Sequence, residues 1–112
     1  MSRNRRTHIV FRIFSGYTVT VIEARSIVET GKRLGVDLKG CAACWIGIPN
    51  DPMHCYLVFG TCATPMDIAH EASHAIEGMF RTVGVSTEAD ETFAYHIGYL
   101  VSRIDKFLGR KL

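Results

Sequence analysis

Two stretches near the start of the chain alternate apolar and polar side chains and predict β-strands. Residues 7–14 (THIVFRIF) and residues 17–23 (YTVTVIE) are also rich in β-branched and aromatic side chains. Ser15 and Gly16 supply a tight turn between them, so the two stretches form a predicted hairpin. Residues 24–35 then show apolar side chains near helical spacing and end in a glycine, which predicts a short helix.

A second pair of strand-like runs follows the short helix. They are CWIGIP at residues 44–49 and CYLVFGT at residues 55–61, and the turn-forming segment NDPMH separates them. This order again predicts a hairpin.

The apolar spacing then changes to that of helices. Thr64 is a suitable N-cap, Pro65 suits the first helical position, and Asp67 falls where an acidic side chain favours a helix start. One apolar stripe follows, ended by Gly84: Ile68, Ala72, Ile76, Met79 and Val83. A last helix is predicted from Ser86 or Thr87 toward residue 108, with its own stripe: Phe93, Ile97, Leu100, Ile104 and Leu108.

These elements predict a single α+β domain over residues 1–112. Its sheet is expected to be small and mostly antiparallel, with the helices packed on one face. Two C-terminal helices follow the four strands, and they contain the candidate site residues described below.

The composition and charge of the chain limit the classes of protein to which it can belong. Hydrophobic residues make up 47 % of the 112 residues, charged residues make up 21 %, and the formal net charge is +2. These values are typical of a soluble globular domain and are too weakly basic to indicate nucleic acid as a partner. No apolar run approaches the roughly 20 residues that span a bilayer, and no signal peptide is recognised. We therefore expect a cytoplasmic protein with no membrane partner, and its oligomeric state stays open.

The candidate chemistry lies in DIAHEASHAIE, which contains an HExxH motif. On a helix, His70 and His74 stack on one face, roughly opposite the apolar stripe. Two imidazoles suit Zn²⁺, and Glu71 is rotated by about 100° from His70. Glu71 can therefore act as general base toward a metal-activated water without being a ligand.

A catalytic zinc usually takes three protein ligands, so a third is needed. Glu91 is the favoured candidate, because it shares one face of the last helix with the small residues Ala94 and Gly98. Glu88 and His96 are the alternatives.

HEASH followed by ETFAY resembles the gluzincin pattern, with HExxH on one helix and a glutamate ligand on the next. The chain is similar to minigluzincins and to small zincin-like proteins encoded by bacteriophages, specifically over residues 64–108 and only in architecture over residues 7–61. The resemblance implies zinc on His70, His74 and Glu91, with Glu71 as general base and acid in peptide hydrolysis. It also implies that a sheet-edge strand, here CWIGIP or CYLVFG, aligns a peptide or protein substrate.

One position departs from the gluzincin pattern. Many gluzincins carry an aspartate four residues after the ligand glutamate, where this chain has Tyr95. A tyrosine there can hydrogen-bond a histidine or stabilise an oxyanion, so Tyr95 is a candidate catalytic residue. Otherwise Asp67, Glu88 or a backbone carbonyl would have to support the histidines.

The four cysteines are expected to be reduced residues in or near the sheet. Cys41 and Cys44 form a CxxC pair and Cys55 and Cys62 follow, so a second, cysteine-bound metal is an alternative. A disulfide between Cys44 and Cys55 is a further possibility if their strands face each other.

Two other functions compete with the peptidase. One is a non-catalytic, zinc-stabilised domain that binds a protein partner, such as a phage accessory or structural factor. The other is a nucleic-acid-binding module, whose mark would be a basic face interleaved with exposed aromatic side chains. The sequence shows only the short basic start MSRNRR.

Overall fold

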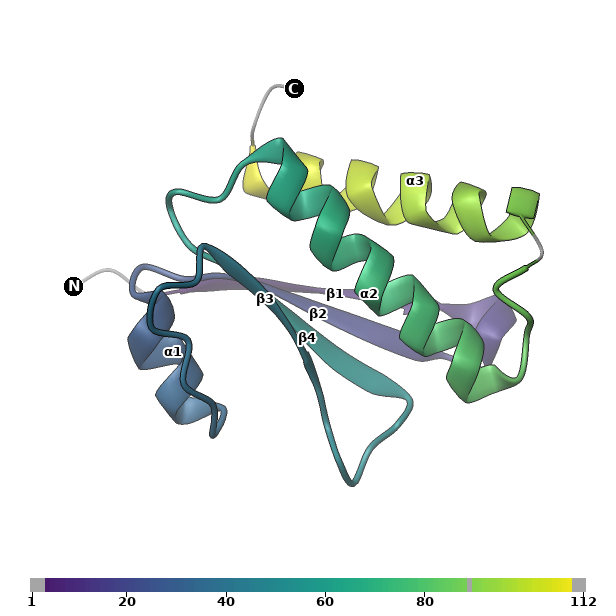
Figure 1. The fold of residues 1–112 in the computed structure, drawn as a ribbon, viewed down its shortest axis with the longest axis horizontal. Coiled ribbons are helices and arrows are strands. Elements are labelled where there is room, and N and C mark those ends of the chain that lie inside the picture. Colours follow the sequence, from purple (N-terminus) through teal and green to yellow (C-terminus); the bar gives the residue numbers. More distant parts are fainter. Residues whose placement is uncertain (1–3, 89, 110–112) are drawn as a thin grey trace.

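The computed structural model describes residues 4–88 and 90–109. Figure 1 shows a sheet with two long helices packed across it. The elements in chain order are β1 (Arg5–Phe11), a 3-10 turn (Arg12–Phe14), β2 (Tyr17–Glu23), α1 (Ile27–Arg33), β3 (Ala43–Gly47), β4 (His54–Phe59), α2 (Pro65–Val83) and α3 (Asp90–Leu108). In the part of the chain that the structure describes, no helix is long and apolar enough to cross a membrane.

The four strands form one mixed sheet in the order β1-β2-β4-β3. The pairing of both predicted hairpins is confirmed, because β1 pairs antiparallel with β2 and β3 pairs antiparallel with β4. The predicted extent of the first strand is wrong, since β1 ends at Phe11 and residues 12–14 form a 3-10 turn. The central pair, β2 and β4, is parallel. A parallel pair needs a crossover connection, which α1 and the segment after it provide. β1 and β3 are therefore the two edges of the sheet.

The main core lies between one face of the sheet and the helices α2 and α3. Val19, Val21 and Leu57 alternate onto this face and have no exposed surface. From α2, the predicted stripe residues Ile68, Ala72, Ile76 and Met79 are equally buried. From α3, Leu100 and Ile104 complete the layer. The helical periodicity in the sequence thus correctly identified the buried face of both long helices.

The expectation that all helices cover one face is wrong for α1. Ile22 and Val58 point to the opposite face, where they form a second, smaller core with Ile27 of α1 and Leu34 just after it. The central strands are therefore buried on both faces at this end of the sheet. Consecutive apolar residues in β4 are the sequence signal for such a strand.

Two caps fix the limits of α2 as the sequence predicted. The Thr64 backbone N–H donates to the Asp67 carboxylate at 2.8 Å, and the Asp67 N–H donates to the Thr64 hydroxyl at 3.2 Å. This reciprocal pair is a capping box. Gly84 ends the helix with a φ of 80°, which suits glycine because it has no Cβ. The helix that carries the HExxH motif is therefore held at both ends.

Thr64→Ala removes the side-chain half of the capping box. We expect the free energy of unfolding to fall by about 1 kcal/mol, because the first turn of α2 loses an acceptor for its N–H groups. Urea unfolding followed by circular dichroism measures this change. Thr61→Ala, an exposed threonine just before the helix, is the matched control. Equal stability of the two variants would contradict the role of the cap.

Candidate metal centre

His70 and His74 form a pair on the exposed side of α2. Their Nε2 atoms lie 3.1 Å apart, and the two rings are nearly perpendicular, at 83°. The His70 side chain is 65 % exposed. The apolar stripe of α2 faces the sheet, so it directs both imidazoles toward solvent. The predicted arrangement of these two side chains on one face is confirmed.

The spacing of the two nitrogens fits a shared zinc ion. Two nitrogens bound tetrahedrally to zinc lie about 3.3 Å apart, because each Zn–N bond is about 2.05 Å. The observed 3.1 Å is close to this span and is also the length of an N–H···N hydrogen bond. Imidazole nitrogens are among the donors that zinc prefers, so the two histidines fit this metal.

Glu71 lies beside the histidine pair but is turned inward. Its side chain is only 11 % exposed, and one carboxylate oxygen lies 3.9 Å from His70 Nε2. Besides burial, its charge is one of the causes that raise the pKa of Cys44 on β3. No described residue forms a hydrogen bond with the carboxylate. The carboxylate is therefore both sheltered and available to water.

Trp45 of the edge strand β3 lies next to the histidine pair. Its ring centroid is 6.4 Å from that of His74. Gly78, one turn after His74, also faces the Trp45 ring, and a Cβ there would make an ordinary contact with it at 3.6 Å. A cavity of about 190 Å³ continues from this point between β3 and the second half of α2. Trp45 is half-buried, and it packs against the main core as well as beside the HExxH motif.

Within the described part of the chain, no third ligand lies beside the pair. Among residues 4–88 and 90–109, no group of three or more His, Cys, Asp or Glu side chains is arranged to hold a metal. Glu88 and Glu91 are both exposed, in the turn before α3 and in its first turn. Only two of the three predicted ligands are therefore together.

The path of α3 explains this separation. Phe93 packs on Phe80, with ring centroids 5.4 Å apart, so α3 begins beside the C-terminal half of α2. Along the axis of α2, the histidines lie about 9 Å or more before Phe80, since each helical residue adds about 1.5 Å. They also lie on the flank of α2 that faces Trp45. Glu91 as a ligand stays a prediction that this arrangement does not support.

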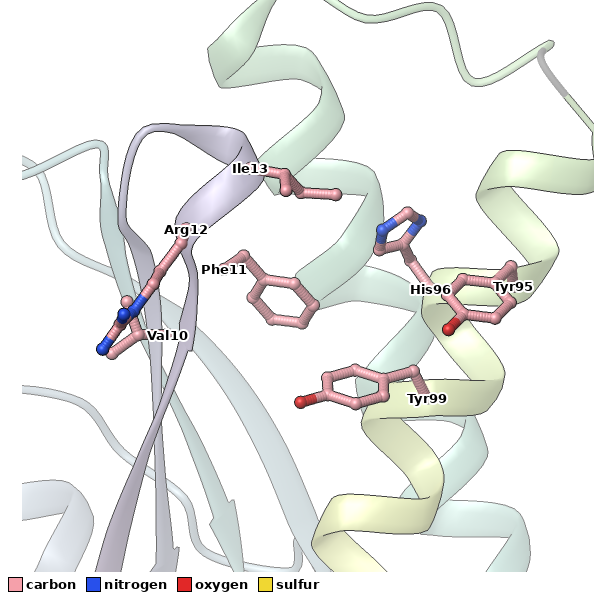
Figure 2. Close-up of a pocket in the computed structure, with 7 residues that line it drawn as sticks. All are labelled: Val10, Phe11, Arg12, Ile13, Tyr95, His96 and Tyr99. Atoms are coloured by element: carbon pink, nitrogen blue, oxygen red, sulfur yellow. The ribbon is translucent and has the colours of Figure 1, made fainter.

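The other candidate residues of α3 lie elsewhere. His96 is a core residue, 7 % exposed, and its Nδ1–H donates to the Thr92 carbonyl at 2.8 Å. Its ring packs against those of Phe11, Phe14 and Phe80. Tyr95 is 69 % exposed and lines a pocket near β1, shown in Figure 2. Asp67 is occupied by the capping box. Among the described residues, the histidines are therefore supported mainly by each other.

The four cysteines are free thiols in different surroundings. Cys41 and Cys62 are exposed, Cys44 is half-buried and Cys55 is buried. Cys44 pairs with Val58 across the hairpin, whereas Cys55 pairs with Gly47 and faces the other side of the sheet. The possible disulfide between Cys44 and Cys55 is therefore wrong, since these thiols point to opposite faces. Burial, then the charges of Glu71 and Cys41, raise the pKa of Cys44.

No protein-family model matches this sequence, and neither the curated proteins nor the solved structures searched contain a significant match. The geometry of the site is therefore the basis for proposing a function.

Cys55 gives the protein a predicted sensitivity to alkali. Burial raises the pKa of its thiol from 9.0 to about 11. Between these values the unfolded chain loses the proton and the folded chain keeps it, so stability falls as the pH rises from about 9 to about 11. We expect wild type to lose about 1 kcal/mol between pH 8 and pH 10, measured by urea unfolding.

Cys55→Ala is the test of this assignment. The variant should be less stable at pH 8, because it leaves a small cavity, but should show a shallower pH dependence up to pH 10. An unchanged slope would assign the alkaline loss to another group, such as Tyr17, whose pKa burial also raises.

Proposed function

We propose that the protein is a zinc-dependent metallopeptidase of the gluzincin type. One observation carries the proposal. His70 and His74 present two imidazole nitrogens 3.1 Å apart, and the sheltered Glu71 carboxylate lies 3.9 Å from one of them. All three side chains lie where α2 runs along an edge strand. This combination would bring a metal, a general base and an extended peptide together.

Each of these side chains has a distinct role. His70 and His74 hold the metal through Nε2, and zinc supplies Lewis acidity that polarises a carbonyl and makes water more acidic. Glu71 takes a proton from the attacking water and returns it to the leaving amine. Its partial burial strengthens its interaction with charges that develop nearby.

The edge strand β3 is the element that aligns the substrate. Of the two predicted candidates, CYLVFG corresponds to β4, which is paired on both sides and has no free edge. CWIGIP corresponds to β3, which is paired on one side only. An extended peptide can add to β3 through backbone hydrogen bonds and pass Trp45 and the histidine pair.

The second candidate function is a non-catalytic, zinc-stabilised domain that binds a protein partner. The specific observation in its favour is that the described residues supply two imidazoles and no third ligand. Such a domain would use the metal and the β3 edge without turnover. Glu71 would then have no chemical role.

Glu71→Gln distinguishes the two functions. For the peptidase, we expect hydrolysis of a fluorogenic peptide library to fall about a hundredfold or more, because the general base is lost, while zinc content stays unchanged. Glu77→Gln, on an exposed turn of the same helix, is the matched control. Wild type that holds zinc but cleaves nothing would favour the non-catalytic domain. Wild type that holds no zinc, when prepared without chelators, would exclude both functions.

Glu91→Ala decides whether α3 contributes the third ligand. A ligand role predicts a fall in zinc affinity comparable to that caused by His74→Ala, measured by competition with a chromogenic chelator. Unchanged affinity would remove Glu91 from the site. The remaining positions would then be filled by water or substrate.

A further inference from the structure

A second surface feature lies at the opposite edge of the sheet. Two cavities follow each other between the edge strand β1 and the helix α3. The first has a volume of about 300 Å³ and lies beside residues 10–13, and the second has a volume of about 560 Å³ and lies beside Thr7 and Ile9. Along α3, the first is lined by residues 95–99 and the second by residues 103–107. We call them together the β1–α3 groove.

The first end of the groove is apolar and aromatic. Figure 2 shows Phe11 and Ile13 on one side and Tyr99 and His96 on the other. Four of the five exposed large hydrophobic side chains in the described chain belong to this pocket: Val10 at 49 %, Ile13 at 78 %, Tyr95 at 69 % and Tyr99 at 38 %. Gathering of exposed apolar surface in one place is typical of a binding site.

The second end of the groove is basic. Arg103 and Lys106 line it, and neither forms an ion pair with any residue that the structure describes. Arg103 is held in place, because its Nη1 donates to the Tyr99 hydroxyl at 2.7 Å. None of the described residues that line either cavity is acidic. The groove therefore favours a ligand that brings carboxylates.

The edge of β1 forms one wall of this groove. β1 has seven residues and, among the strands that the structure describes, pairs only with β2, so its outer backbone groups have no partner strand in the described chain. An unpaired edge next to a side-chain pocket is the arrangement used for recognition of an extended peptide.

We propose that the β1–α3 groove binds an extended acidic segment of a protein partner, which adds to β1 as a fifth strand. A hydrophobic side chain of the segment fills the pocket formed by Phe11, Ile13 and Tyr99. Carboxylates four to six residues away reach Arg103 and Lys106. The spacing follows from the helix, since residues 95 and 106 are about 16 Å apart along α3, or about five residues of extended chain.

This surface is separate from the proposed peptidase site. β1 and β3 are at opposite edges of a four-stranded sheet, about 14 Å apart at a strand spacing of about 4.8 Å. A single-stranded nucleic acid would also use cations and aromatic rings. It would leave the free backbone edge of β1 without a role, whereas a peptide strand uses all three features.

Fluorescence anisotropy with designed peptides tests the proposal. The probe is a capped ten-residue peptide with glutamate at its second and fourth positions, phenylalanine at its eighth and valine or threonine elsewhere. A peptide of the reversed order is included, because an added strand can run in either direction. We expect one of the two to bind wild type, and to bind the Arg103→Glu/Lys106→Glu variant at least about tenfold more weakly. Lys39→Glu, an exposed lysine at another surface, is the matched control.

Two modified peptides test the other contacts. N-methylation at alternate residues removes the strand hydrogen bonds, and replacement of the phenylalanine by serine removes the anchor; each should abolish binding. Tyr95→Ser, an exposed wall of the pocket, should weaken the parent peptide but leave the thermal unfolding midpoint unchanged. Unfolding midpoints equal to wild type establish that every variant is folded.

Several results would overturn the proposal. One is that neither peptide order binds. Another is binding that is insensitive to N-methylation. Tighter binding of a ten-nucleotide oligothymidine, lost in the double variant, would assign the groove to nucleic acid. Concentration-dependent dimers in sedimentation, lost in the same variant, would assign it to a second copy of this chain.

Discussion

The packing of α2 on the sheet determines the geometry of the rest of the molecule. Its stripe of Ile68, Ala72, Ile76 and Met79 is completely buried, so the helix cannot rotate about its axis without exposing apolar surface. That fixed rotation sends His70 and His74 to solvent and leaves Glu71 largely buried. The capping box and Gly84 fix the ends of the same helix. The candidate metal centre is thus a consequence of hydrophobic burial on the opposite face of α2.

The sheet has two edges, and each lies beside a different long helix. β3 runs beside α2, where a histidine pair, a sheltered carboxylate and Trp45 meet. β1 runs beside α3, where an aromatic pocket meets Arg103 and Lys106, which form no ion pair with any described residue. Both edges offer free backbone groups to an extended chain, but their side chains differ in kind. These differences are the basis for proposing chemistry on a peptide at the first edge and recognition of an acidic peptide at the second.

The separation of Glu91 from the histidines follows from how the two long helices pack. Phe80, Phe93 and His96 form an aromatic cluster that holds the start of α3 against the C-terminal half of α2. His96 is therefore a core residue, although histidine as a residue type can also bind a metal. Tyr95 points to the β1 side for the same reason. Helical periodicity predicted which side of α3 each residue occupies. It did not predict where along α2 the helix α3 packs.

The sequence by itself determined the two hairpins, the limits of α2 and the buried stripe of each long helix. These features depend on local alternation, on turn residues and on caps, which act over a few residues. It also placed His70 and His74 on one face, since spacing of four residues is sufficient for that. Only the tertiary structure decided the parallel pairing of β2 with β4, the place of α1 on the opposite face, and the distance between Glu91 and the histidines. These depend on contacts between segments far apart in the chain, whose geometry is set by the packing of whole elements rather than by any local pattern.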